Sequence, residues 1–370
     1  GTFFFFLFGN YPILVSPFLG HSGLTRAPHM PNTSMTPLAM DPPKAGEMLA
    51  LADDLYWMRF TLPFRLNHIN LYAFDTKDGW LLLDCGIQSQ TIADQWQVML
   101  AGPLADQPVI GIIVSHYHAD HVGYAGALAA ITGAPIYMGA IEHAQASWSL
   151  NQSDAAYSTL LANTYALFGL DGDVVDHIRS QGNYFRKLSG DLPDVTIIDT
   201  NHRFHSKSGT WTPRFDTGHS PGHMSLSDHD RKLHICVDFL LPRISPNISV
   251  SLRSIEIDML GHYYSYLDQM RHLTNDWLII PGHDWPYFGG GVRAVDLIEH
   301  HNKRLDLLRD AAAIEPITTA DAMHTLFTFD LTDHELFFAS CEARAHLNHL
   351  DARNEMQIQT EDGIEYFYLG

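Results

Sequence analysis

The segment Val109–Val114 is an apolar, largely β-branched run, and three histidines and an aspartate follow it within positions 116–121. The composition and length of the run predict a buried strand. Imidazole and carboxylate groups at the end of a buried strand are costly unless a partner compensates them, and a divalent metal ion is the usual partner. This segment therefore predicts a metal site at the edge of a sheet.

The spacing within the cluster divides it into two pairs. His116 and His118 lie two residues apart in an extended stretch, so they share a face and can hold one ion. Asp120 and His121 follow after the chain turns, and they can face a second ion. Two coordination spheres need further ligands from elsewhere in the chain.

Four other segments offer polar residues close to predicted strands, with glycine nearby. They are Asp84 in 80–86, His219 in 216–226, Asp238 in 233–238 and His283 in 277–286. Glycine lets the backbone approach an ion closely, and loops at one edge of a layered α/β structure are where sites are assembled. We therefore expect these residues to converge on the 116–121 cluster.

The ordered motifs LLLDCG, SHYHADHVG, DTGHSPGH, CVD and PGHDWP resemble those of the metallo-β-lactamase-fold hydrolases, over about residues 51–290. The resemblance implies an α/β fold, a four-layered αββα sandwich with metals at one edge. It also implies a set of ligands: His116, His118 and His219 for the first ion, Asp120, His121 and His283 for the second, and Asp238 bridging both. Asp84 would orient ligands through hydrogen bonds without touching the metal, and His223 would be a packing or hydrogen-bonding residue.

Histidine and aspartate ligands without cysteine suit two Zn²⁺ ions, with manganese or iron as alternatives. Two ions roughly 3.5–4 Å apart can hold a shared hydroxide and polarise a carbonyl or phosphoryl oxygen of the substrate. We expect this bridging hydroxide to be the nucleophile, and Asp120 to orient it.

Residues beyond the ligand motifs are weaker candidates for a substrate pocket. Arg243 and Asn247 follow Asp238 closely, and a role in a structural turn explains them equally well. Tyr263 and Tyr264 stand at the start of a predicted amphipathic helix, where a hydroxyl could donate a hydrogen bond to a tetrahedral oxyanion. We expect core packing for both tyrosines rather than this role.

Proline content and the order of predicted strands and helices divide the chain into three parts. Residues 1–45 are rich in proline and form an irregular leader, disordered or mistranslated. Residues 46–290 alternate strands and helices and form the metallo-β-lactamase-like domain, in which 141–188 is a helical insertion that either caps the site or decorates the surface. Residues 291–370 suggest three helices and a hairpin at Asp362-Gly363, the outline of a winged-helix-like domain used for packing or homodimerisation.

The charge balance narrows the function. Lys and Arg number 22 against 42 Asp and Glu, and a net charge of −20 makes nucleic-acid and membrane partners unfavourable.

The metal motifs are similar to those of glyoxalase-II-like thioesterases and acyl-lactone hydrolases. We therefore expect a small-molecule ester, thioester or lactone as substrate. A nuclease or phosphodiesterase of the same fold is the alternative. A redox member is disfavoured, because diiron reductases of this fold replace a ligand histidine and this chain keeps HxHxDH.

The cysteines bear on the compartment. Cys85, Cys236 and Cys341 are far apart and odd in number, which fits neither a disulfide framework nor a cysteine zinc site. A reducing, cytoplasmic location is the simplest expectation, although the apolar residues 3–8 leave export open.

Overall fold

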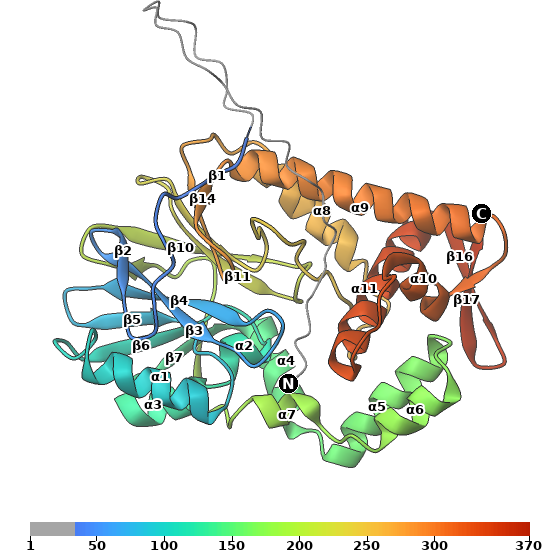
Figure 1. The fold of residues 1–370 in the computed structure, drawn as a ribbon, viewed down its shortest axis with the longest axis horizontal. Coiled ribbons are helices and arrows are strands. Elements are labelled where there is room, and N and C mark those ends of the chain that lie inside the picture. The colour runs from blue at the N-terminus through green and yellow to red at the C-terminus, as the bar shows by residue number, and fades with distance from the viewer. Residues whose placement is uncertain (1–33) are drawn as a thin grey trace, which may run out of the picture.

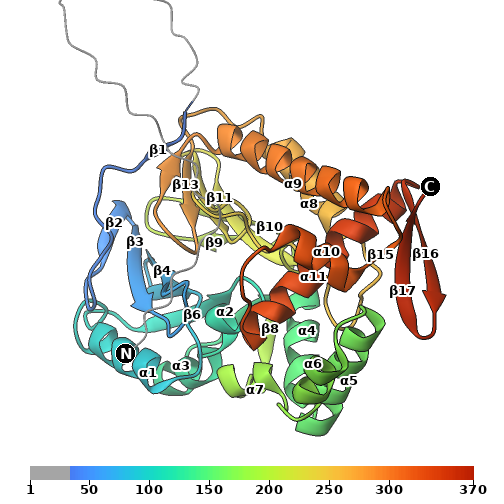
Figure 2. The ribbon, with the colours of Figure 1, turned by 45° about the vertical axis from the view of Figure 1, so that its right-hand side comes forward.

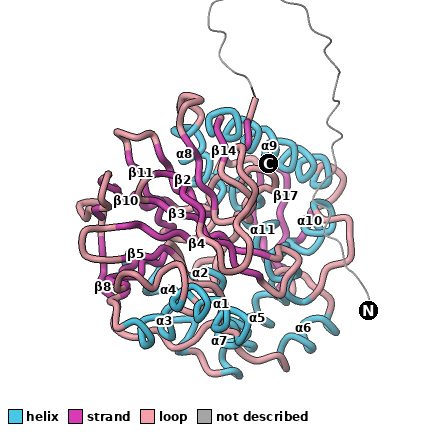
Figure 3. The backbone as a smooth tube through the Cα atoms, turned by 60° about the vertical axis from the view of Figure 1, so that its left-hand side comes forward, coloured by secondary structure: helices cyan, strands magenta, loops and turns pink. Residues whose placement is uncertain are grey.

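The computed structural model describes residues 34–370, and two seven-stranded sheets packed face to face form its centre. Figure 3 shows the strands of both sheets between α1 and α3 on one side and α8 and α9 on the other. The first sheet comprises, in spatial order, β2 (Leu49–Ala52), β3 (Leu55–Thr61), β4 (His68–Asp75), β5 (Trp80–Leu83), β6 (Val109–Val114), β7 (Ile136–Gly139) and β8 (Val195–Ile198).

The second sheet continues the sandwich with antiparallel neighbours except for one parallel pair, β12 and β13. Its strands are, in spatial order, β1 (Thr36–Pro37), β14 (Tyr287–Phe288), β13 (Leu278–Pro281), β12 (Leu233–Val237), β11 (His223–Asp228), β10 (Thr210–Asp216) and β9 (Phe204–His205). The predicted strand Val109–Val114 is confirmed as β6.

Large apolar side chains from both sheets fill the space between them. Trp57 and Phe74 of the first sheet share one cluster with Trp211 and Ile235 of the second, and all four are buried. Strands β5 and β6 run parallel in the first sheet. Their carboxyl ends therefore meet at one edge, and this edge receives the loops that follow them.

Helices cover the outer faces of both sheets, which gives the expected four layers (Figure 1). Helices α1 (Gln90–Ala101) and α3 (Ala125–Thr132) lie on the first sheet, and α8 (Met259–Met270) and α9 (Gly290–Ala312) lie on the second. Helix α1 illustrates why: Ser89 caps its first turn, and Ile92, Trp96 and Met99 form its buried stripe. The short helix α2 (Ala119–Val122) follows the histidine cluster directly.

The segment 141–188 is helical, as expected. It contains most of α4 (Ala140–Asn151) and all of α5 (Asp154–Leu167), α6 (Gly172–Arg179) and α7 (Tyr184–Leu188). Its own small apolar cluster packs against Leu336 and Phe337, which lie in the last long helix of the chain. The segment is therefore fixed against the C-terminal region.

The C-terminal region contains two further helices and a three-stranded sheet of order β15-β17-β16. These elements are β15 (Ile317–Thr318), α10 (Thr319–Leu326), α11 (Asp333–Ala352), β16 (Met356–Glu361) and β17 (Ile364–Leu369). The predicted hairpin is confirmed: Asp362 and Gly363 have φ of 50° and 83°, the left-handed pair that a tight hairpin turn requires. Winged-helix-like character remains a prediction.

Two expectations change at the ends of elements. Helix α8 begins at Met259, because Asp258 caps it by accepting a hydrogen bond from the Gly261 amide, so Tyr263 and Tyr264 lie inside the helix. Most of the predicted leader, residues 1–33, lies outside the described residues. Thr36–Pro37 pairs with β14, so the end of that leader belongs to the second sheet. Within the described part of the chain, we find no helix with the length and apolar content needed to cross a membrane.

Candidate metal centre

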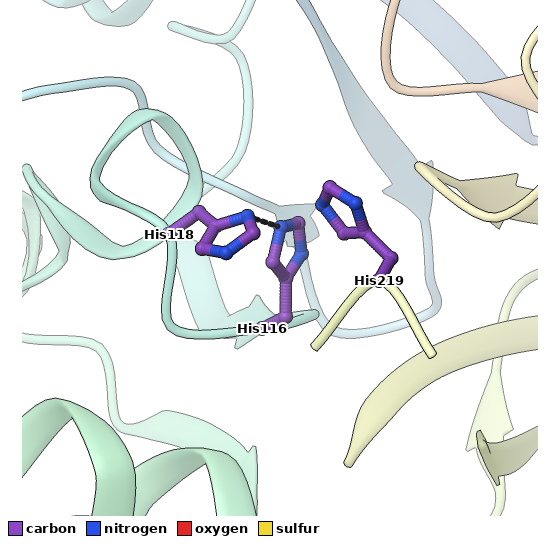
Figure 4. Close-up of side chains that lie close together, drawn as sticks. All are labelled: His116, His118 and His219. Atoms are coloured by element: carbon purple, nitrogen blue, oxygen red, sulfur yellow. Dashed lines mark hydrogen bonds between the residues drawn. The ribbon is translucent and has the colours of Figure 1, made fainter. Parts of the chain in front are cut away.

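Three histidines meet at the edge of the sandwich where β5 and β6 end. His116 and His118 come from the loop after β6, and His219 comes from the loop between β10 and β11. His116 Nε2 lies 3.1 Å from His118 Nδ1, and the three candidate ligand atoms lie within 4.8 Å of one another. Figure 4 shows His118 and His219 on either side of His116. We call His116, His118 and His219 the first group.

A second group forms beside it from Asp120, His121 and His283. The Asp120 Oδ2 atom lies 3.6 Å from His121 Nε2 and 3.4 Å from His283 Nε2. The candidate ligand atoms of this group also lie within 4.8 Å of one another. The structure thus places the two pairs of the 116–121 cluster in neighbouring groups, and a third candidate group, His116, His121 and Asp238, joins them.

Asp238 stands between the two groups. Its Oδ2 atom lies 3.4 Å from His219 Nε2 of the first group, and 3.4 Å and 3.3 Å from His121 Nε2 and His283 Nε2 of the second. The preceding residue, Val237, has a φ of 47°, which is a strained value for a β-branched side chain. The strained backbone directs Asp238 to a position between both groups.

Hydrogen bonds fix the orientation of three of the histidine rings. His121 Nδ1 donates to Asp84 Oδ2, His219 Nδ1 to the Asn247 carbonyl, and His283 Nδ1 to the His68 carbonyl, each at 2.8 Å. Carbonyl and carboxylate oxygens only accept, so in each ring Nε2 is the atom available for a metal.

Buried atoms without partners show that these residues fit a metal. Within residues 34–370, His121 Nε2, His219 Nε2 and Asp238 Oδ1 are buried and accept or donate no hydrogen bond. Such atoms cost about 1–3 kcal/mol each unless something satisfies them. A Cβ added at Gly282 would lie 2.3 Å from Asp238 Oδ1, so the backbone closes tightly around this carboxylate. The donor set therefore suits divalent cations held by imidazole and carboxylate.

Asp84 holds the two groups to the first sheet. It follows β5 directly with a φ of 63°, a left-handed conformation that aspartate tolerates. Its carboxylate accepts from the Ser115 amide, the Ser115 hydroxyl and His121 Nδ1, each at 2.8 Å. It touches His121 through the nitrogen that faces away from the centre, which fits the predicted orienting role.

The two groups differ in electrostatics. Burial and the neighbouring imidazoles lower the pKa of His116 and His118 well below its usual value. In the second group burial also disfavours the charged imidazole, but Asp120 and Asp238 outweigh it. These carboxylates raise the pKa of His121 well above its usual value and that of His283 to about 10.

Glu142 supports the first group, although no sequence motif predicted a role for it. Glu142 of α4 is fully buried, and its Oε1 accepts from the Ser220 hydroxyl at 2.8 Å and the Gly222 amide at 2.5 Å. Its Oε2 accepts from the Tyr117 amide at 2.7 Å. Burial raises the pKa of Glu142 to about 7 against these three donors. Glu142 thus joins the two loops of the first group, and no motif in the sequence points to it.

The predicted pocket residues fall into two sets. Arg243 Nη2 contacts Asp284 Oδ1 at 2.9 Å, directly beside His283, and the Arg243 side chain is 61% exposed. Asn247 contacts the centre through its backbone carbonyl, which accepts the hydrogen bond from His219 Nδ1. The contacts of the tyrosines agree with core packing and leave no oxyanion role: the buried Tyr263 hydroxyl donates to the Phe239 carbonyl and the Tyr264 hydroxyl to Asn302, both at 2.8 Å. Because α8 packs on the outer face of the second sheet, these two hydroxyls serve packing.

His223 does not join the ligands. Its Nε2 accepts a hydrogen bond from the Asp238 backbone amide at 3.3 Å, so it helps to hold the backbone that carries the Asp238 carboxylate. This arrangement agrees with the packing or hydrogen-bonding role expected for it.

A further group with metal-like spacing, His301, Glu342 and His346, lies in the C-terminal region. His346 Nδ1 donates to the Glu342 carbonyl at 2.8 Å, so its Nε2 accepts from His301 Nδ1 at 3.0 Å. The Glu342 carboxylate lies 3.2 Å from the Arg304 guanidinium. Because Arg304 already neutralises Glu342, we interpret this group as a buried polar network.

The fold and the two groups define a metal-dependent hydrolase built on a two-sheet sandwich. Residues 65–283 match the family model described as the metallo-beta-lactamase superfamily, and residues 305–369 match the metallo-beta-lactamase-like, C-terminal domain. Since the first match alone spans more than half of the chain, the protein belongs to the metallo-beta-lactamase superfamily.

Solved structures agree with this assignment. A beta-lactamase domain protein from Burkholderia ambifaria is 29% identical with a TM-score of 0.83, over 91% of this chain and 98% of that one. A metallo-beta-lactamase family protein from Thermus thermophilus is 20% identical with a TM-score of 0.73, over 87% and 100%. A sec-alkylsulfatase from Pseudomonas sp. is 15% identical with a TM-score of 0.51, over 82% and 50%, and shares the fold alone. A search of the curated proteins found no match.

Proposed function

We propose that this chain is a dinuclear zinc hydrolase that cleaves an ester, thioester or lactone. The observation that carries the proposal is the position of Asp238, whose Oδ2 lies 3.3–3.4 Å from histidines of both groups. A carboxylate between two sets of imidazoles is the ligand that two neighbouring ions would share. Imidazole and carboxylate ligands without thiolate suit zinc.

When bound, two zinc ions supply a Lewis acid for the substrate carbonyl and a water molecule made nucleophilic near neutral pH. Asp120 is the residue best placed to act on that water. Its side chain is 23% exposed, whereas the side chains of His121 and His283 are 0% and 1% exposed. Asp120 therefore faces the open side of the centre, where its carboxylate can orient the water and accept its proton.

Apolar side chains beside the centre support an acyl substrate. The ring of Phe338 lies 6.2 Å from that of His118, and Phe185 of the insertion lies 5.9 Å from Tyr117. Aromatic side chains near a metal centre suit an organic acyl group. The net charge of −20 opposes a polyanionic substrate such as RNA.

A substrate panel tests the proposal. Protein loaded with two equivalents of zinc would be assayed against thioesters, lactones, carboxylic esters, phosphodiesters and RNA. We expect hydrolysis of at least one acyl class and a loss of about 1,000-fold in kcat/KM for His118→Ala, because Lewis-acid assistance contributes several kcal/mol. Preferential cleavage of phosphodiesters or RNA would replace the proposed function by the nuclease alternative. Full activity of His118→Ala, or binding of far less than one zinc, would contradict the mechanism.

We also propose a cytoplasmic location. Cys85, Cys236 and Cys341 are all unpaired and buried, which is compatible with a reducing compartment. Fractionation of the native cell, followed by immunodetection, would test it.

A further inference from the structure

Helix α11 of the C-terminal region extends to the first group. In Figures 1 and 2 one end of α11 lies on the side of the molecule that carries α2 and α4. Glu335 of its first turn pairs with Arg65 of the loop before β4 at 3.0 Å, and Phe338 stands edge-on to His118. This end of the helix therefore contacts both the loop before β4 and a histidine of the first group.

The orientation of His219 depends on a single carbonyl, that of Asn247, at 2.8 Å from its Nδ1. Asn247 belongs to the stretch 241–250, which forms neither helix nor strand. A carbonyl in irregular backbone is positioned only by whatever else holds that stretch. The position of His219 Nε2 therefore depends on the anchor of Asn247.

The side chain of Asn247 is anchored on α11, while Arg293 of α9 holds the start of the same stretch through the carbonyls of Leu241 and Ile244. The Asn247 amide Nδ2 donates to Glu342 Oε2 at 2.8 Å and to the Phe338 carbonyl at 3.3 Å. Glu342 is 4% exposed, and its Oε1 lies 3.2 Å from Arg304 Nη2 of α9. A buried carboxylate held between a guanidinium and an amide has little freedom to move.

These contacts form one continuous chain from the C-terminal region to a candidate ligand. Arg304 fixes Glu342, Glu342 fixes Asn247, and the Asn247 carbonyl fixes His219. We infer that Glu342 and Asn247 are positioning residues through which the C-terminal region holds His219 for the first metal ion. The inference rests on the proposed dinuclear site and gives the C-terminal region a part in metal binding.

Zinc affinity is the readout, because it does not depend on which substrate is cleaved. Both zinc dissociation constants would be measured against a competing chromophoric chelator for Glu342→Ala, Asn247→Ala and the double variant. We expect each single variant to weaken one of the two constants by about tenfold, the lower end of the effect of a partner of a ligand histidine. The double variant should be no weaker than either single one, because both changes remove the same anchor.

A matched control separates positioning from folding. Glu365→Ala breaks the ion pair with the buried Arg344 in the same region, far along the chain from Asn247. It should lower the melting temperature and leave both zinc constants unchanged. Glu342→Gln retains an oxygen that can accept from Asn247, so its zinc constants should stay within about threefold of the wild type.

The inference is overturned if Glu342→Ala and Asn247→Ala bind both ions with wild-type constants, if their effects multiply in the double variant, or if Glu365→Ala weakens zinc equally. If Glu342→Ala does not fold, Asn247→Ala decides alone. Failure of the acyl-hydrolase proposal would appear in the substrate panel and would leave these constants unaffected.

Discussion

The two ligand groups share one carboxylate but differ in how they meet a metal ion. The first group, His116, His118 and His219, consists of imidazoles whose pKa values burial lowers, so they are neutral near pH 7. The second group contains His121 and His283, whose pKa values the adjacent carboxylates raise. An ion entering the first group displaces no proton, whereas one entering the second must displace protons.

The two groups also differ in which parts of the fold hold their side chains in place. The first is held by contacts from outside the sandwich, through Glu142 of α4 and Asn247 beside α11. The second is held within the sandwich by Asp84, at the end of β5. The comparison indicates that the second group is supported within the core fold, whereas the first has further contacts to the added helices.

Removing the shared ligand should have the largest effect. Asp238→Ala leaves neither group complete, so we expect a fall in kcat/KM of at least about 1,000-fold and a loss of zinc from both positions. Metal analysis and steady-state kinetics measure these effects. Asp54→Ala, which removes a buried carboxylate paired with Arg231, is the control for folding. Retention of two zinc ions by Asp238→Ala would refute the shared position.

The pH dependence of metal binding sharpens the electrostatic contrast. A histidine with a raised pKa keeps its proton at pH 7 and loses it only as the pH rises through the folded value, which is about 10 for His283. Zinc affinity at the second group should therefore rise with pH by about tenfold per unit for each proton released, while affinity at the first stays nearly flat above about pH 6.5. Calorimetry between about pH 6 and 8 in buffers of different ionisation enthalpy counts these protons. Equal proton release in both binding steps would remove the distinction.

Asp84→Asn tests the internal support of the second group. The carboxamide offers one oxygen to the three donors that now point at Asp84, so its NH2 group faces at least one of them and His121 loses its fixed orientation. We expect zinc affinity at the second group to fall by about 10- to 100-fold. Chelator competition measures the change, with Asp54→Asn as the matched substitution of a buried aspartate at another place in the sandwich. An unchanged affinity would show that His121 needs no such partner.

Glu142→Gln tests the external support and should have the smallest effect. The amide nitrogen of glutamine would face one of the three donors that now point at the carboxylate. We expect a loss of about 1–3 kcal/mol in the free energy of unfolding and an effect on zinc confined to the first group. Urea denaturation of the metal-free protein gives the first quantity. A shift in affinity at the second group alone would contradict the assignment of Glu142.

The sequence predicted the parts of the site that lie in short motifs. Strand β6 and the cluster after it are local features, because alternation of side chains sets which histidines share a face. The sequence left two roles open for Tyr263 and Tyr264, because spacing along the chain does not show which face of α8 packs on a sheet. Glu142 was missed because one acidic residue early in a helix resembles any solvated residue until the fold buries it.

The sequence by itself determined the donor types, their order and the class of fold, since these follow from residue chemistry and from patterns a few residues long. Only the tertiary structure decided which atoms face one another: Asp238 between two groups, and Glu342 behind Asn247 and His219. The physical reason is that these contacts join residues far apart in the chain. Their distances are set by how the two sheets and the covering helices pack, and no local pattern encodes that packing.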